Sequence, residues 1–548
     1  MTTPAVYFTT THFIFSWSRI KRRPTTRGTE MGYVEISLKL PTDFTEEQLQ
    51  RKTGKQLRLK SFSYQIERKS LDARKKSDIH WKVKVAVSSR ELKNNAPVVP
   101  PPLEIPYRKR NKKVVVVGSG PAGFFAALTL QKAGFQTTVI ERGRDVAGRA
   151  ESIKTFENTG RFDAAGNYAF GEGGGGTFSD GKLTARTRRF SRERAFITAA
   201  YIRAGAPEEI AYLAHPHIGS DNLRVIVKNL RKEFIGMGGT VLFETKMEDL
   251  RIRDGFVTEA VTAAGSFEAE EFLLAPGHSA YETYRMLIRR GVKFRTKNFA
   301  VGCRVEHPQK IINLAQWGNE HLPGVKAAEY RLTGRGGSDR PVYTFCMCPG
   351  GVVVPSTAYA NANIVNGMSL YQRSGRFANS ACVGGIHPDE MAGRETTPLE
   401  ALDQVAALEE KFHRSTRSFK APFCSILDFL NETESSKETE SSYPLGLTPA
   451  PLWEMLPLKL SRALQSGLKE FNRQLPGFET GNLIGLESKT SSPIQVLRNR
   501  DGLCEGFKNL YLIGEGSGYA GGIVSSGVDG IRAALGVVER DQSSGCSA

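Results

Sequence analysis

The chain has 548 residues, of which 40% are hydrophobic, and a formal net charge of +18. This length has room for about three or four domains, and the hydrophobic content is ordinary for a globular protein. No apolar run approaches the ~18–20 residues that cross a bilayer, and seven scattered cysteines are too few for a disulfide framework. These features argue against a membrane-spanning protein or a disulfide-stapled secreted domain, and they favour a reducing, cytoplasmic setting.

The positive charge gathers at the start of the chain. Residues 1–113 hold 25 Lys and Arg against 10 Asp and Glu, so the rest of the chain is nearly neutral. Residues 1–29 contain no acid and many Thr and Arg, which is typical of an organellar transit peptide. The alternative, which we favour, is that translation starts at Met31, because structured sequence begins at Tyr33. Both interpretations predict that residues 1–30 are a disordered tail.

A small α+β domain is predicted over residues 31–90. Residues 34–40 alternate in hydrophobicity like a strand, and Thr42 opens a short helical run. Residues 62–69 and 79–88 alternate again. We expect these elements to form a ferredoxin-like domain.

Residues 91–112 are rich in proline and then basic, which predicts a semi-rigid linker. The basic charge of this part of the chain is also what an RNA-binding face would carry. An RNA reader needs exposed aromatic side chains as well, and Tyr64, Trp81 and Tyr107 are few. We therefore interpret the charge as a solvated surface and do not expect nucleic acid as a partner.

A dinucleotide-binding pattern follows the linker. Val114 to Val117 form a short β-branched run suited to a buried parallel strand. Gly118, Gly120 and Gly123 then give G-x-G-x-x-G ahead of a helical pattern. A second strand ends at Glu141, about 20 residues after the glycines, where a ribose-binding acid belongs.

Each residue type in this pattern has a physical role. Gly118 permits the tight turn out of the strand, Gly120 lets a pyrophosphate approach the backbone, and Gly123 lets the helix pack closely on the sheet. The free N–H groups of the helix N-terminus favour phosphate. Glu141 would accept a ribose 2′-OH and repel a 2′-phosphate, which favours FAD or NAD over NADP; the adjacent Arg142 weakens that preference.

The nucleotide-binding domain is predicted to begin at residue 113 and to run to residue 298. Within it, the glycine-rich residues 171–182 predict a loop, because no strand precedes them. Residues 221–238 predict a helix. Four short segments over residues 240–267 predict a β-meander.

A change of pattern predicts a second, α+β lobe over residues 299–480, in which the polar residues 431–442 form an exposed loop. The chain closes with a strand over residues 509–514, a glycine turn and a helix from Val524. This end is either a plain βα unit or a segment that returns to the first sheet and adds backbone donors around the same cofactor. We expect the second arrangement for residues 481–548.

With these motifs the chain resembles the bacterial FAD-dependent dehydrogenases, which belong to the NAD(P)/FAD-dependent oxidoreductases. The resemblance covers about residues 33–535. It is carried by KSLDARKK at 69–76, GSGPAG at 118–123, GEGGGGTFSDGKLTAR at 171–186, HPHIGSDNL at 215–223, LAPGHSAYET at 274–283, FCMCPGGVVVPS at 345–356, LESKTSSPIQVLRN at 486–499 and LIGEGSGYAGGIVSSGVDGIRAA at 512–534.

The resemblance implies an α/β fold with a Rossmann-like FAD-binding domain of the glutathione-reductase and p-hydroxybenzoate-hydroxylase type, beside an α+β substrate lobe. It implies FAD as cofactor. The leading hypothesis adds an unknown small molecule as substrate and NAD(P)H as electron donor; since no second nicotinamide domain is visible, NAD(P)H would bind transiently or not at all. The FAD-binding residues that it implies are Gly118, Gly120, Pro121, Ala122, Gly123, Glu141, Arg142, Gly277, Gly514, Glu515, Gly521, Gly522 and Ile523. The chain departs from the family pattern at Lys489 and Gln495, where Arg would be expected.

Three residues are candidates for the chemistry. His278 follows a predicted strand end, where cofactor sites form, although a helix-capping segment with Ser279 is the interpretation we favour. Lys182 would hold a phosphate or pair with the reduced flavin, or would be solvated in a loop. Arg304 lies in an apolar stretch, as a substrate anchor or as half of a buried structural ion pair.

Cysteines and histidines suggest further chemistry that we do not expect. Cys346 and Cys348 invite a disulfide-reductase interpretation, but two core cysteines on one strand face fit the spacing better. His215 and His217 lack accompanying ligands of metal spacing, so no metal site is predicted.

The leading functional hypothesis is an FAD-dependent oxidoreductase. Two alternatives stay open. The basic first 113 residues suggest a tRNA- or RNA-modifying flavoprotein, and a protein that binds FAD without catalysis would show the same motifs.

Overall fold

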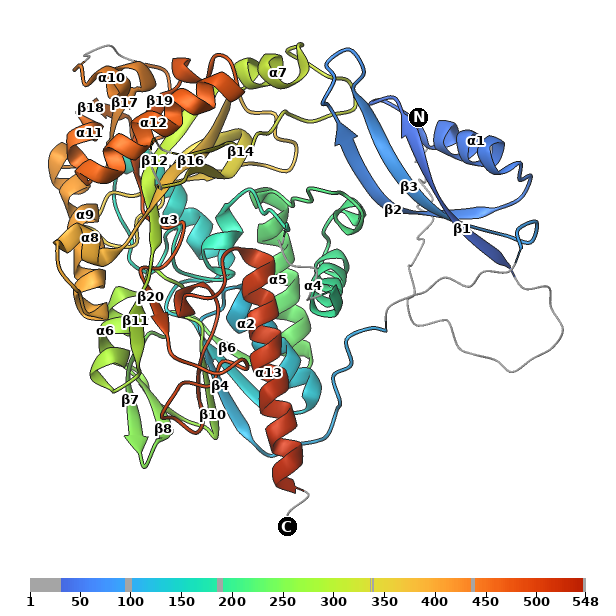
Figure 1. Cartoon of the computed structure of the whole chain (residues 1–548). Coiled ribbons are helices and arrows are strands. Elements are labelled where there is room, and N and C mark those ends of the chain that lie inside the picture. The colour runs from blue at the N-terminus through green and yellow to red at the C-terminus, as the bar shows by residue number, and fades with distance from the viewer. Residues whose placement is uncertain are drawn as a thin grey trace, which may run out of the picture.

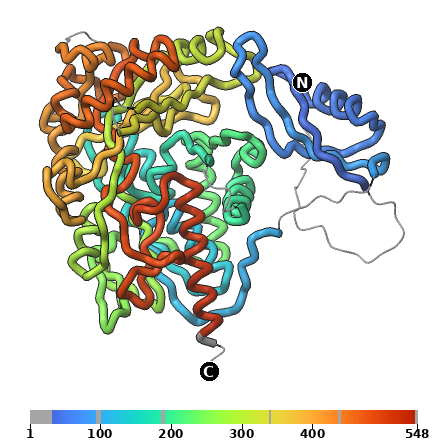
Figure 2. Tube along the Cα trace, in the orientation of Figure 1, coloured from blue at the N-terminus to red at the C-terminus, as the bar shows by residue number. Residues whose placement is uncertain are grey.

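The computed structural model describes residues 31–93, 101–184, 191–335, 337, 340–434 and 439–545. The tail predicted over residues 1–30 and part of the predicted linker lie outside these residues. The tube trace shows residues 31–93 standing beside the body formed by the rest of the chain (Figure 2). Within the described ranges, no helix has both the length and the apolar character needed to cross a bilayer.

The N-terminal unit is an antiparallel sheet with one helix. Its elements are β1 (Gly32–Leu40), α1 (Glu46–Leu57), β2 (Ser63–Asp72) and β3 (His80–Ser89), and the strand order is β1-β3-β2. Thr45 starts α1 with a capping box, since its side chain accepts from the Gln48 N–H. A ferredoxin-like domain needs a second helix and a fourth strand. Residues 31–93 contain neither, so that part of the prediction is wrong.

The N-terminal unit is joined to the body by backbone hydrogen bonds. The Lys69 N–H donates to the Tyr212 carbonyl at 2.8 Å, and the Ala214 N–H donates to the Lys69 carbonyl at 2.9 Å. Figure 1 shows β2 as the strand of this unit that faces the body. The unit is therefore docked at one edge of β2 rather than tethered by the linker alone.

A parallel sheet forms the nucleotide-binding half. Its order is β21-β10-β4-β5-β6, and every neighbouring pair is parallel. The strands are β4 (Lys113–Val117), β5 (Gln136–Ile140), β6 (Thr240–Leu242), β10 (Glu271–Leu274) and β21 (Leu510–Leu512). The first and last strands of this sheet in chain order, β4 and β21, thus flank β10. The prediction that the C-terminal strand returns to the first sheet is confirmed.

The predicted meander is confirmed for three of its four strands. β7 (Met247–Arg253), β8 (Phe256–Thr262) and β9 (Gly265–Glu268) form an antiparallel sheet. The first predicted strand is instead β6, which pairs in parallel with β5. It follows helix α5 (Ser220–Gly236) and enters the nucleotide-binding sheet as its edge strand.

Helices α2 (Pro121–Ala133) and α13 (Ile523–Gly545) lie side by side on the parallel sheet (Figure 1). They pack closely, because a Cβ at Gly530 would lie 2.0 Å from the Ala122 carbonyl oxygen. The remaining helices of this half are α3 (Val146–Thr159), α4 (Ser191–Arg203), α5 and α6 (Tyr281–Arg289). Helix α5 matches the helix predicted over residues 221–238.

The second lobe is built on an eight-stranded sheet of order β13-β14-β16-β12-β19-β17-β18, with β15 paired to β14. Its strands are β12 (Phe299–Pro308), β13 (Thr333–Gly334), β14 (Val342–Pro355), β15 (Val365–Met368), β16 (Phe377–Ile386), β17 (Ala421–Ser425), β18 (Leu447–Pro449) and β19 (Asn482–Glu487). Its helices are α7 (Gln309–Trp317), α8 (Pro388–Ala392), α9 (Pro398–Thr416), α10 (Ile426–Asn431), α11 (Leu452–Met455) and α12 (Leu458–Gln474). A short ladder of β11 (Phe294–Thr296) and β20 (Ile494–Val496) completes the strands.

Candidate cofactor and substrate site

A cavity of about 1310 Å³ lies between the nucleotide-binding sheet and the second lobe. Twelve of the predicted cofactor residues line it: Gly118, Gly120, Pro121, Ala122, Glu141, Arg142, Gly277, Gly514, Glu515, Gly521, Gly522 and Ile523. The three candidates for chemistry, Lys182, His278 and Arg304, line it as well. Gly123 is the predicted cofactor residue that stays outside this lining.

The three fingerprint glycines have different surroundings. A Cβ at Gly118, where φ is +97°, would lie 2.3 Å from the Ala275 carbonyl oxygen, and one at Gly123 would lie 1.9 Å from the Gly118 carbonyl oxygen. Both glycines therefore allow chain segments to pack against each other. A Cβ at Gly120 would meet only the Gly174 Cα, at 3.7 Å, and would stand at the cavity. Gly120 is thus the glycine that leaves room for a ligand.

Helix α2 begins at this opening. Gly120 is its N-cap residue and provides no side-chain cap, and Pro121 occupies the first turn. The N–H groups of the first turn thus have no side-chain partner at the cap and lie at the positive end of the helix dipole. Such a terminus favours an anionic group such as a pyrophosphate.

The C-terminal segment brings a second helix start to the same cavity. A Cβ at Gly514 would lie 2.7 Å from the Ala122 Cβ, so the turn after β21 touches the first turn of α2. The Gly514 N–H donates to Asp529 Oδ2 at 2.7 Å, which fixes this turn to α13. Residues 521–526, which include the first turn of α13, line the cavity. Two segments about 400 residues apart in the chain therefore share one cavity.

Glu141 is buried and held rigidly. Its carboxylate accepts hydrogen bonds from the N–H and hydroxyl of Ser119 at 2.9 and 2.8 Å. It also accepts from the N–H groups of Gly143 and Gly171 at 2.9 and 3.1 Å. The acid stands where a ribose-binding residue is expected, and a ribose hydroxyl would share these oxygens with the backbone donors. Arg142 turns aside, since its guanidinium pairs with Glu282 at 2.7 Å.

The glycine-rich segment is a series of turns with one short 3₁₀ helix over Gly174–Phe178, in agreement with the predicted loop. The fully buried Arg149 of α3 holds it in place. Its guanidinium donates to the carbonyls of Asn167, Tyr168 and Gly174 at 2.7, 2.8 and 2.7 Å. Sequence reasoning missed Arg149, because nothing in the helix pattern marks an arginine whose partners lie in a later loop.

His278 does not cap a helix. Helix α6 begins after Ala280 and has no side-chain cap. The imidazole lies at the cavity, with Nδ1 3.1 Å from Glu515 Oε2. Both ring nitrogens are buried, and neither has a hydrogen-bond partner among the described residues. An unpartnered polar atom in a cavity wall is expected where a ligand completes the site.

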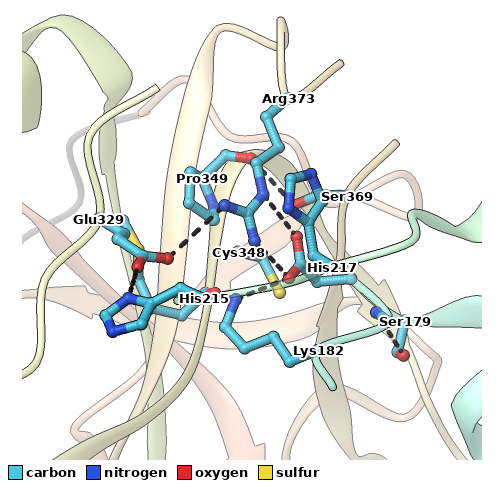
Figure 3. A network of polar contacts seen from close by, with 12 residues as sticks. Ser179, Lys182, His215, His217, Glu329, Cys348, Pro349, Ser369 and Arg373 are labelled. Carbon is cyan, nitrogen blue, oxygen red and sulfur yellow. Dashed lines mark hydrogen bonds and ion pairs between the residues drawn. The ribbon is translucent and has the colours of Figure 1, made fainter. Parts of the chain in front are cut away.

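Lys182 belongs to a charged network rather than to a solvated loop (Figure 3). Its ammonium lies 2.7 Å from Asp180 Oδ2, and Arg373 reaches the same carboxylate at 2.6 and 3.0 Å. Burial opposes the charged form, but the Lys182 and Arg373 charges hold the pKa of Asp180 well below its usual range. Arg373 also lies 3.5 Å from Glu329, which pairs with His215.

The two histidines considered as metal ligands have separate partners. His215 contacts Glu329, whereas His217 Nε2 lies 3.0 Å from the Tyr371 carbonyl. Burial lowers the pKa of His217 to about 4 and keeps this imidazole neutral. Among the described residues, no cluster of three or more His, Cys, Asp or Glu has a metal-binding arrangement.

Arg304 is fully buried on β12. Its guanidinium donates to Glu487 Oε2 at 3.0 Å, to Asn379 Oδ1 at 2.8 Å and to the Cys346 carbonyl at 2.8 Å. The structure thus shows the buried ion pair that was one of its two interpretations, in a side chain that also lines the cavity. Lys489, where Arg was expected, forms another buried pair with Glu409 at 2.8 Å. Gln495 accepts from the Arg295 guanidinium at 2.9 Å.

Cys346 and Cys348 do not share one flat strand face, contrary to the prediction. The pairing of β14 with β16 shifts register between Phe345 and Cys348, which marks a bulge. Cys346 has a φ of +46° there and lines the cavity, whereas Cys348 is buried.

Comparisons with known proteins agree with this architecture. A family described as "FAD-dependent protein, C-terminal domain-like" matches residues 298–490, and an NAD(P)-binding Rossmann-like domain matches residues 116–176. A domain of unknown function matches residues 33–88. An uncharacterized protein of Clostridium beijerinckii is 39% identical over 499 residues, which cover 87% of this chain and 92% of its own length.

Solved structures resemble the chain more distantly. Glycine oxidase from Bacillus cereus is 12% identical at a TM-score of 0.31, with 79% of this chain and 96% of that chain covered. The glycerol-3-phosphate dehydrogenase from Bacillus halodurans, complexed with FAD, is 11% identical at a TM-score of 0.36, with 79% and 65% covered. The extended match to the Clostridium protein, with the profile of the second lobe, shows that this chain belongs to the family of FAD-dependent proteins that carries this C-terminal domain.

Proposed function

We propose that the protein is an FAD-dependent oxidoreductase that acts on a small molecule in the second-lobe part of the cavity and exchanges electrons with NAD(P)H. The observation that carries the proposal is the meeting of residues 118–122 and 514–526 at one cavity of about 1310 Å³. Bound FAD would supply two-electron transfer, while the protein would supply binding, orientation and electrostatics.

The residues on the nucleotide side have distinct parts in this proposal. The first-turn N–H groups of α2, beside Gly120, would hold the pyrophosphate. Glu141, fixed by four hydrogen bonds, would accept a ribose hydroxyl. The first turn of α13 would present the positive end of a helix dipole to negative charge on a reduced cofactor.

His278 is the candidate for proton transfer. Its Nδ1 lies 3.1 Å from Glu515 Oε2, the residue lines the cavity, and both ring nitrogens lack a hydrogen-bond partner among the described residues. An imidazole with unpartnered ring nitrogens at a cavity can carry a proton to or from a bound substrate. The polar groups of Lys182 and Arg304 are already occupied by acids, and we assign them to shaping the cavity.

The test begins with the absorbance spectrum of the purified full chain. We expect a yellow protein that releases FAD on denaturation, and anaerobic rapid mixing with NADH or NADPH should bleach the flavin absorbance. A colourless protein that takes up no added FAD would contradict the proposal. A yellow protein that neither nucleotide reduces would favour a non-catalytic FAD-binding protein.

The RNA-modifying alternative finds little support in the aromatic residues of the N-terminal unit. The Trp81 indole donates to the Thr42 carbonyl at 2.9 Å, and the Lys69 ammonium lies 4.5 Å from its ring. Tyr64 donates to Glu46 at 3.3 Å. These rings are engaged within the unit, whereas single-stranded RNA requires free stacking faces. If the protein does not change the mobility of RNA in a gel shift at low salt, the RNA-modifying alternative is wrong.

A further inference from the structure

Cys346 stands in the cavity wall and Cys348 lies beneath it, at a point where the backbone departs from regular strand geometry. Cys346 has a left-handed φ of +46° inside β14, a conformation that costs energy in a residue with a Cβ. The register of β14 against β16 shifts between Phe345 and Cys348, and the Cys348 thiol donates to the carbonyl of Cys346. Unfavourable backbone kept at a cavity is often linked to function.

The two thiols differ in access. Cys346 is half-buried and lines the same cavity as the cofactor residues, whereas Cys348 is buried beneath it. The Cys348 Sγ lies 3.3 Å from the Cys346 carbonyl oxygen, and an Arg304 N–H points to this sulfur at 3.4 Å. The pair thus has one sulfur that a reactant can reach and one that stays inside.

We propose that Cys346 and Cys348 form a redox-active pair that closes to a disulfide and opens again within the cofactor cavity. In this pair Cys346 is the accessible thiol that a reactant meets, and Cys348 is the resolving thiol. A disulfide across one intervening residue is strained, and strained disulfides are the easily reduced ones that serve catalysis or regulation.

The electrostatic surroundings favour a reactive Cys346. The neighbouring Cys348 thiol and the positive charges of Lys182 and Arg304 outweigh burial and lower the pKa of Cys346 to about 7. The same arrangement raises the pKa of Cys348. Four other described cysteines contrast with Cys346, because burial raises the pKa of Cys303, Cys382, Cys424 and Cys504.

Oxidation of the two thiols to a disulfide releases as many electrons and protons as the reduction of FAD consumes. The two thiols lose two protons and two electrons as the S–S bond forms, and oxidised FAD takes up both electrons and both protons. The reverse reaction breaks the S–S bond, returns a hydrogen to each sulfur and leaves FAD oxidised. This electron exchange depends on the FAD binding proposed above, whereas the existence of the thiol pair does not.

Thiol chemistry of the full chain tests the pair without any need for activity. After equilibration with oxidised glutathione, the peptide that carries both residues should lose the mass of two hydrogen atoms, and dithiothreitol should restore it. Cys346→Ser and Cys348→Ser should each abolish this change, while Cys382→Ser, on the neighbouring strand β16, should leave it intact. Cys346→Gly, which suits the left-handed φ, provides a second variant in case the serine variant misfolds.

Alkylation rates test the reactive member. At pH 7 iodoacetamide should modify Cys346 about tenfold faster than a cysteine of ordinary pKa, because about half of it, rather than a few per cent, is thiolate. Absence of the disulfide at every redox poise, or alkylation of Cys346 no faster than that of Cys382, would overturn the proposal.

Reductive titration tests the exchange with flavin. Oxidised wild-type protein should take up four electrons per FAD from dithionite, and Cys348→Ser only two. Uptake of two electrons by both proteins, with the disulfide still present, would show a thiol pair that does not communicate with the flavin and would overturn that part. A colourless protein that still forms the disulfide would instead contradict the proposed function and leave the pair standing.

Discussion

The two walls of the cavity differ in composition: one is largely backbone and the other is largely side chains. The nucleotide-binding wall consists largely of backbone at Gly118, Gly120, Gly514 and Gly522, with helix termini behind it. The wall toward the second lobe consists of side chains, and its charged members pair with opposite charges; Figure 3 shows one such network, in which Lys182 of the glycine-rich loop lies near Arg373 of the second lobe. Backbone donors suit a cofactor that is the same in many proteins, whereas a wall of side chains can change with the substrate.

This contrast predicts that substitutions in the two walls have different effects on ligand binding and on the free energy of unfolding. A side chain added to the backbone wall blocks space, while a side chain removed from the charged wall leaves its partners without compensation. The four changes below separate these effects, from the largest to the smallest.

Asp180→Asn should cause the largest loss of stability. The substitution leaves Lys182 and Arg373 beside a neutral amide in a buried site, and breaking a buried ion pair in this way costs about 3–5 kcal/mol. Chemical denaturation of the full chain measures the change. Asp403→Asn removes a partly exposed partner of Arg285 and should cost less than about 1 kcal/mol. Equal losses of unfolding free energy in the two variants would show that the buried network stabilises the fold no more than an exposed ion pair does.

Gly123→Ala should rank second and should act through packing alone. The added Cβ would lie 1.9 Å from the Gly118 carbonyl oxygen, so α2 must move away from β4, at about 1–3 kcal/mol or more. A thermal melt of the apoprotein reports this loss. Gly236→Ala is the matched control, because a Cβ there meets nothing within 4 Å and should be neutral or slightly stabilising.

Gly120→Ala should leave the fold intact and weaken the binding of FAD. Its Cβ meets the Gly174 Cα at 3.7 Å, an ordinary contact, but occupies the approach to the α2 terminus. We expect a Kd for FAD at least about tenfold higher, which corresponds to ~1.4 kcal/mol. Quenching of flavin fluorescence during titration of the apoprotein gives this Kd. Unchanged affinity would place the pyrophosphate elsewhere in the cavity.

The pair of Glu329 and His215 should show the smallest effect, as a pH dependence. Burial raises the pKa of Glu329, but the hydrogen bond from His215 and the charges of Lys182 and Arg373 outweigh burial and lower this pKa from 4.5 to about 2. The stability that ionised Glu329 contributes to the fold is therefore lost as the pH falls from 4.5 to about 2. The Glu329 hydrogen bond raises the pKa of His215 above 6.5, so that contribution is lost as the pH rises through the raised value.

The contribution of this pair should therefore peak between about pH 4.5 and 6.5, at less than about 1 kcal/mol because the His215 side chain is 71% exposed. Melting temperatures of wild type and Glu329→Gln from pH 3 to pH 8 give the difference. A difference that stays constant from pH 3 to pH 8 would rule out the titration.

Features set by neighbouring residues could be predicted from the sequence. The Thr45 cap, the glycine turn before α2 and the return of β21 all depend on local patterns or on one hydrophobic strand. Contacts between distant segments carried no such signal. Arg149 and Asp180 act on partners that only the folded chain brings near, and no spacing rule identifies them.

The strand predictions fail for the same reason. Residues 240–242 have a correct strand pattern, yet whether they join a meander or the parallel sheet depends on where α5 delivers them. The bulge at Cys346 arises from the register of β14 against β16, which alternation of residue types does not encode.

The close packing of α13 on α2, through Gly530 and Ala122, has a consequence for biosynthesis. The β4–α2 turn leaves the ribosome about 400 residues before its opposite side, which residues 514–526 supply. A nascent chain therefore presents half of the cavity until those residues are made. If the cavity holds FAD as proposed, loading must wait for this segment, and a premature stop near residue 500 would yield a protein unable to retain the cofactor.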